Sequence, residues 1–178
     1  MRSSAINTCS YTGIVTLSQY VGSEKVPVAQ VKNAGSNPLF NFVSDCLIGD
    51  FDLAKRNLPA KIKLLSVETD SDGKITDYKA ASSGFIYLTT TPEKVYSKTS
   101  GIVRYSFMIP RDVVKDLDST TTFNGIGLYT KAATESDLGG FAAFCSLPEG
   151  FENNISKSSV LVVDWLLTFT NQEGNKNV

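Results

Sequence analysis

Histidine, the side chain that most often serves as a general base, is absent from this chain of 178 residues. Its absence excludes Ser-His-Asp and Cys-His arrangements and removes the commonest metal ligand. Carboxylates remain, and three pairs are spaced two residues apart: Asp50 and Asp52, Asp70 and Asp72, Glu135 and Asp137. Each pair falls in a predicted loop, where carboxylates solvate a turn more often than they face a substrate at catalytic separation. We therefore predict that the protein is not an enzyme, and we assign no catalytic residue.

The sequence offers few candidates for a catalytic nucleophile. Ser-Lys arrangements could come from Ser156-Lys157-Ser158 or from Lys98-Thr99-Ser100, but both read as polar turns with nothing to desolvate the lysine. The three cysteines lie far apart, so neither a zinc site nor a disulfide framework is expected. Cys46 and Cys145 sit in apolar patterns and are predicted to be buried thiols.

One acidic stretch has the beginning of a calcium-loop spacing. Asp70, Asp72 and Gly73 follow the D-x-D-G order, and Asp77 lies further on. A complete loop needs a bidentate Glu at its twelfth position, which this chain lacks. Asp-Gly is also a favoured hairpin turn. We predict a hairpin turn here, with no metal site and no cofactor.

A saccharide is the alternative ligand that the composition supports. Sugars stack on exposed aromatic rings, and carboxamides or carboxylates nearby bind their hydroxyls. Asn124 and Asp137 could supply such groups. The candidate rings are Tyr78, Tyr87, Tyr96 and Tyr129. The competing interpretation is that these tyrosines lie half-buried on strands with their hydroxyls at the surface.

Charge and hydropathy narrow the classes of partner. The net charge is −1 without a basic run, which argues against nucleic-acid binding. The longest apolar run, Val160–Leu167, is far shorter than the ~20 residues that cross a bilayer, so no membrane partner is expected. The N-terminus lacks the apolar segment of a signal peptide, which predicts folding in a cytoplasm.

The elements that must position any site are mostly strands. In Ser158–Thr170, five apolar side chains recur at period two, which predicts a strand inside a packed sheet, with Trp165 in the core. Similar patterns predict about nine or ten short strands, separated by turn signals every 8–12 residues or so. The predicted fold is all-β: a single β-sandwich, with a jelly-roll-like connectivity as the finer expectation. The other predicted strands are Tyr11–Tyr20, Val26–Lys32, Lys61–Val67, Lys74–Tyr78, Phe85–Thr90, Ile102–Ile109, Thr121–Lys131 and Phe141–Leu147.

One amphipathic helix is predicted over Asn37–Gly49. Pro38 suits its first turn, Gly49 suits the position after its end, and an apolar stripe would pack on the sheet. A partner-binding helix is the second interpretation. The stripe consists of Leu39, Phe42, Val43, Cys46 and Leu47. Around it we expect an N-terminal arm (1–10), a sandwich domain (11–170) and a polar tail (171–178).

Two stretches together resemble small β-rich virion proteins of tailed bacteriophages. The first runs from Lys32-Asn33-Ala34-Gly35 through the helix to Asp50-Phe51. The second joins Gly125-Ile126-Gly127-Leu128-Tyr129-Thr130 to Phe141–Leu147 and the strand ending at Thr170. The resemblance implies a non-enzymatic structural or assembly protein of the head, neck, tail or baseplate. It also implies other virion proteins as partners, a homo-oligomer, and assembly in the host cytoplasm. It carries over no site residue.

Overall fold

Strand β10 lies in the middle of an antiparallel sheet, between β1 and β7. The computed structural model describes residues 8–35, 37–72, 75–96, 100–117, 123–151 and 155–172. In this part of the chain the strands are β1 (Thr8–Val21), β2 (Glu24–Gly35), β3 (Pro59–Thr69), β4 (Ile75–Ala80), β5 (Ile86–Tyr87), β6 (Glu93–Tyr96), β7 (Ser100–Ile109), β8 (Gly125–Thr130), β9 (Ala143–Ser146) and β10 (Leu161–Gln172). The helices are α1 (Asn37–Ile48), α2 (Phe51–Asn57) and α3 (Arg111–Asp116).

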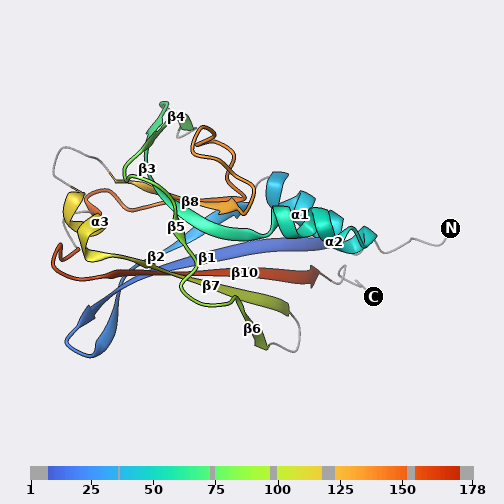
Figure 1. The fold of residues 1–178 in the computed structure, drawn as a ribbon, viewed down its shortest axis with the longest axis horizontal. Coiled ribbons are helices and arrows are strands. Elements are labelled where there is room, and N and C mark those ends of the chain that lie inside the picture. The colour runs from blue at the N-terminus through green and yellow to red at the C-terminus, as the bar shows by residue number, and fades with distance from the viewer. Residues whose placement is uncertain are drawn as a thin grey trace, which may run out of the picture.

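Two antiparallel sheets make up the sandwich (Figure 1). Sheet A has the order β2-β1-β10-β7-β6, and sheet B has the order β4-β3-β8-β9. The end of β2 also pairs with β9, through Ala34 and Gly35, and so joins the sheets on one side. On the other side the Leu88 amide donates to the Ala60 carbonyl of β3 at 3.2 Å, and the Thr89 amide donates to the Ser106 carbonyl of β7 at 3.0 Å. The all-β prediction is confirmed, whereas the jelly-roll connectivity is not confirmed by this strand order.

The core lies between the facing sides of the two sheets. The alternation predicted for β10 is confirmed, because its odd-numbered residues from Leu161 to Phe169 pack into the core and Trp165 is fully buried. Sheet B contributes Ile62 and Leu64 from β3 and Ile126 and Leu128 from β8, all fully buried. Burial of these apolar side chains is the main favourable contribution to the stability of the fold.

Strand β8 shows why its glycines are needed. Glycines inside a strand usually mark a bulge or the close approach of another backbone, which is what the sequence predicts for Gly125 and Gly127. Instead, aromatic rings lie over them: a Cβ on Gly127 would stand 2.6 Å from Cε2 of Tyr129, and one on Gly125 would stand 2.7 Å from Cε2 of Phe144. The absence of a side chain at each glycine therefore leaves space that an aromatic ring occupies on the outer side of sheet B.

The predicted helix is confirmed as α1, and Gly49 follows it with a φ of +80°. Residues 50–59 were predicted to be a loop, but Asp50 caps α2 by accepting from the Leu53 amide at 3.0 Å. The sequence of 111–117 is compatible with a short helical turn or an irregular strand, and the structure has helix α3 there, starting directly after Pro110. No helix in the described ranges is long and apolar enough to span a membrane.

Other differences concern the edges of the sheets. The strand predicted over 85–90 shrinks to Ile86–Tyr87, and β6, which was not predicted, pairs with β7. Because proline has no amide hydrogen to donate, Pro27 predicts an edge strand or a strand paired on one side only. At this position β2 pairs with β1 alone. Strands β1 and β10 run to Thr8 and Gln172, past the sandwich bounds expected at 11 and 170. Residues 1–7 and 173–178 lie outside the described residues.

Candidate functional site

The paired carboxylates mostly hold local structure. Asp50 caps α2, and Asp52 forms an ion pair with Lys55 at 3.5 Å one turn further along the same helix. The Asp70 side chain accepts from the Asp72 amide at 3.0 Å, which is an Asx turn. These contacts assemble no two carboxylates around a common space.

The acidic hairpin behaves as a turn. Strands β3 and β4 pair on either side of it, and the Asp77 side chain accepts from the Tyr78 amide at 2.8 Å. Within the described residues no three acidic or cysteine side chains gather as a metal site would require. Gly73 and Lys74, which complete the predicted turn, lie outside those residues.

Glu135 lies beside two buried lysines of β3, Lys61 and Lys63, which the sequence did not predict to be buried. Lys63 is 3% exposed and forms an ion pair with Glu135, while the Lys61 ammonium donates to the carbonyls of Ala133 at 2.6 Å and Lys131 at 3.3 Å. The Phe85 ring lies 4.3 Å from the Lys61 nitrogen. Burial lowers the pKa of Lys61, against the opposing charge of Glu135. Both ammonium groups are used to hold the segment 131–142 against sheet B.

The nucleophile candidates are also occupied or inert. Lys157 donates to the Leu117 carbonyl, and the Ser156 and Ser158 hydroxyls lie 2.9 Å apart. Lys98 and Thr99, of the second Ser-Lys candidate, lie outside the described residues, as does the side chain of Ser100. These contacts hold the loops in place.

The two cysteines with described side chains differ sharply. Cys145 is buried as predicted, and burial raises the pKa of its thiol to about 12. Cys46 was predicted to be buried but is exposed. The prediction was wrong because only the first half of α1 packs on the core, through Leu39 and Phe42, so the apolar stripe is exposed further along the helix.

The three candidate tyrosines whose side chains are described do not form a shared platform. Tyr129 is fully buried and its hydroxyl donates to the Leu138 carbonyl at 2.6 Å, while Tyr78 packs edge-on against Phe141. Tyr87 is 65% exposed on β5, and the side chain of Tyr96 is not described. Asn124, proposed as a sugar-binding neighbour, instead bonds both the amide and the carbonyl of Val67.

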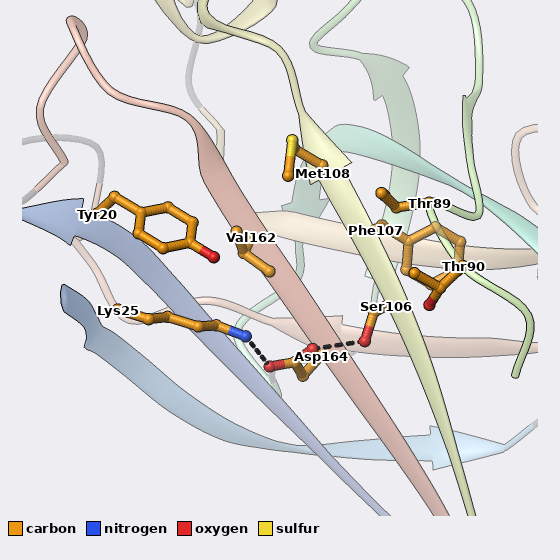
Figure 2. A pocket seen from close by; sticks show the side chains of 9 residues that line it. All are labelled: Tyr20, Lys25, Thr89, Thr90, Ser106, Phe107, Met108, Val162 and Asp164. Atoms are coloured by element: carbon orange, nitrogen blue, oxygen red, sulfur yellow. Dashed lines mark hydrogen bonds and ion pairs between the residues drawn. The ribbon is translucent and has the colours of Figure 1, made fainter. Parts of the chain in front are cut away.

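A pocket of about 180 Å³ opens on the outer side of sheet A (Figure 2). Asp164 lies on its floor, 18% exposed, and accepts from Lys25 at 2.5 Å and from the Ser106 hydroxyl at 2.7 Å. Tyr20 forms one wall and Thr90 lies on the opposite side, beyond β7. Strands β1, β2, β7 and β10 thus bring together polar groups that are far apart in the sequence.

A second surface lies at the end of the molecule where α1 and α2 lie side by side, opposite the β1–β2 hairpin (Figure 1). Its exposed side chains are Leu47 (82%), Ile48 (77%), Phe51 (65%) and Leu53 (42%), which we call the helical face. Large apolar side chains this exposed and this close in sequence are typical of contact surfaces.

Comparison with known proteins returned no match, whether the chain was scanned against family models, curated proteins or solved structures. The functional argument therefore depends on the geometry of these two surfaces and on the chemistry of their side chains.

Sequence reasoning did not identify the pocket residues as site residues, and of the helical face it named only Leu47, in the alternative interpretation of a partner-binding helix. For the pocket a signal was present: Asp164 is the one charged residue of β10 and stands among the apolar residues of its first half. For the helical face the signal was the apolar pair Leu47-Ile48 just before Gly49, followed at once by Phe51.

Proposed function

We propose that this protein is a non-enzymatic structural protein that acts through protein–protein contacts in an assembly. The helical face carries the proposal. Leu47, Ile48 and Phe51 keep most of their surface in water. Covering them with a partner would remove apolar surface on the order of several hundred Å² from contact with water. A helix pair whose only task was to close the sandwich would turn such side chains inward.

The occupant we propose for the helical face is a second copy of this chain. Helix α2 carries Asp52 in its first turn and Lys55 and Arg56 in its last. Two copies of α2 packed antiparallel about a twofold axis would place the acid of each beside the bases of the other, around the apolar side chains. Stable protein–protein interfaces of standard size bury about 800 Å² on each partner, so the proposed dimer interface includes the charged rim as well as the helical face.

The test is the molar mass in solution, measured by light scattering after size exclusion between about 1 and 200 µM. We expect a dimer or larger closed oligomer, and a Leu47→Glu, Ile48→Glu double variant that is monomeric. Val21→Glu is the matched control, because Val21 is 68% exposed at the far end of the molecule. A wild-type protein that stays monomeric throughout contradicts the proposed occupant.

The charged rim gives an independent check. Asp52→Lys should weaken self-association, because like charges would then meet across the twofold axis. Adding Arg56→Asp to the same chain should restore it by reversing both signs. Equal association of all three proteins would show that α2 does not meet its copy in this orientation.

The resemblance to small virion proteins supports a place in the capsid, neck, tail or baseplate of a tailed bacteriophage. In that setting the contacts would be made with other virion proteins as well as with further copies. Mass spectrometry of purified particles tests this: we expect the chain to co-purify with particles at a stoichiometry that is a multiple of their symmetry. A chain found only in the soluble fraction of the infected cell contradicts the virion assignment.

A further inference from the structure

The pocket over Asp164 contains a partly exposed carboxylate, and the proposed assembly role does not explain this residue. A carboxylate on the outer side of β10 stands in the most apolar strand of the chain and is still 18% exposed. Exposed ion pairs contribute about 0–1 kcal/mol to stability, so stability alone is a weak reason for this residue. The hollow beside it makes the carboxylate accessible to a small molecule.

We propose that this pocket binds one neutral pyranose ring of a saccharide. Lys25 compensates the charge of Asp164, so the floor has no net charge and favours neither an anion nor a cation. It still presents an acceptor and a donor side by side, because the lysine nitrogen lies 2.5 Å from Oδ2 of Asp164. Two adjacent sugar hydroxyls, one donating and one accepting, match that pair.

Free bonding capacity remains on both groups. A carboxylate has about four acceptor positions, and the bonds from Lys25 and Ser106 use two of them. The lysine ammonium has three N–H donors, of which one is directed to Asp164. A ligand could therefore bond to this network without breaking it, and would lose no preformed interaction on binding.

The walls supply the apolar half of the recognition. Tyr20 is 39% exposed and its hydroxyl points toward the middle of the pocket, while Met108, 41% exposed, lies across the opening (Figure 2). The negative face of an aromatic ring attracts the positively polarised C–H groups along one side of a pyranose. Thr89 and Thr90 line the far side of the pocket.

The size of the hollow limits the ligand. Its volume of about 180 Å³ is below the roughly 300 Å³ at which pockets for drug-sized molecules begin. One sugar ring is the appropriate scale, with the rest of a glycan continuing into solvent. For a ring of this size in an open pocket we expect a dissociation constant of about 1 mM.

The experiment is a two-dimensional NMR titration of the full chain with methyl glucoside, methyl galactoside, methyl mannoside and N-acetylglucosamine. At least one probe should shift the amides of Tyr20, Lys25, Ser106 and Asp164, with saturation near the low millimolar range. N-acetylneuraminic acid and glucosamine, each charged, should bind at least about fivefold more weakly than that probe. No saturable shift at these amides with any neutral probe overturns the proposal, and so does stronger binding of a charged one.

Two matched variants locate the site. Tyr20→Ala should weaken binding about tenfold, whereas Tyr87→Ala, which removes an exposed tyrosine from β5, should leave it unchanged. Asp164→Asn should weaken binding by a similar factor, and its amide spectrum reports whether the fold is kept. Should Tyr87→Ala abolish binding while Tyr20→Ala does not, the saccharide binds on β5 and the pocket assignment is wrong.

Discussion

The outer sides of the two sheets make different use of charged residues. On sheet B, Lys61 and Lys63 project outward from β3 and are then covered by the segment 131–142 and by Phe85. On sheet A, Asp164 projects outward from β10 and remains reachable through the pocket. Both are charged groups on central strands, but Lys63 is 3% exposed and Asp164 is 18% exposed.

The difference separates a structural use of charge from a use in binding. Each buried ammonium on sheet B is matched inside the protein, by carbonyls, a carboxylate or a ring, and both lysines are almost fully shielded from solvent. On sheet A, the partner of Asp164 is itself 36% exposed, and the network remains open on one side. The cover over a charge, more than the charge itself, decides whether a ligand can meet it.

Alkaline pH should affect sheet B most. Burial raises the pKa of the Cys145 thiol to about 12 and raises the pKa of the Tyr78 and Tyr129 hydroxyls. Because the unfolded chain releases these protons first, the free energy of unfolding is intact below pH ~9 and falls as the pH rises. Urea unfolding should show a loss of roughly 3 kcal/mol by pH 11.

Two controls separate the contributions to that loss. The lowered pKa of Lys61 acts in the opposite direction, because the unfolded chain holds this proton longer than the folded protein. Cys145→Ala should make the alkaline loss shallower, and Cys46→Ala, at the exposed thiol, should not. Identical slopes in all three proteins would show that the burial of Cys145 contributes nothing.

Strand glycines should differ between the sheets. Gly127→Ala places a methyl group against the fully buried ring of Tyr129, and we expect a loss of about 2–3 kcal/mol in the free energy of unfolding. Gly101→Ala on β7 meets no atom within 4 Å and should change it by less than about 0.5 kcal/mol. Chemical denaturation measures both, and equal effects would contradict the tight cover of sheet B.

Removing the counter-charge of Lys63 should leave a buried ammonium without its partner. Glu135→Gln is expected to lower the free energy of unfolding by about 2 kcal/mol. Adding Lys63→Met should recover most of the loss, since the buried charge is then gone. Glu93→Gln, in an exposed pair with Arg104 at 3.8 Å, is the control and should have almost no effect.

The smallest effect is expected at the pocket. Asp164→Asn keeps the shape of the side chain, and Lys25 can turn its ammonium to solvent, so the loss should be about 1 kcal/mol or less. Thermal unfolding of this variant beside Glu135→Gln compares the two faces directly. A loss at Asp164 larger than that at Glu135 would mean that the charge on sheet A is structural after all.

Period-two patterning was enough to predict most of the sandwich. The strands β1, β2, β3, β7 and β10 coincide with predicted strand runs, because successive side chains of a strand point to opposite faces of the sheet and only one face has to meet the core. Helix α1 could also be predicted, because Pro38 suits the first turn of a helix and Gly49 suits the position after its end. Helix α2 was missed because seven residues with mixed charge show too little periodicity to distinguish a helix from a loop.

Local sequence determined where most of the strands lie, which one carries a lone carboxylate, and where two glycines fall within a strand. The tertiary structure alone decided what lies over each of them. The ring above Gly125 comes from Phe144 on β9, the partner of Lys63 is 72 residues away, and Lys25 reaches Asp164 across 139 residues. Contacts at such separations depend on how the sheets are paired and covered, which no local pattern encodes. Whether a polar residue holds the fold or meets a ligand is therefore settled by its neighbours in space.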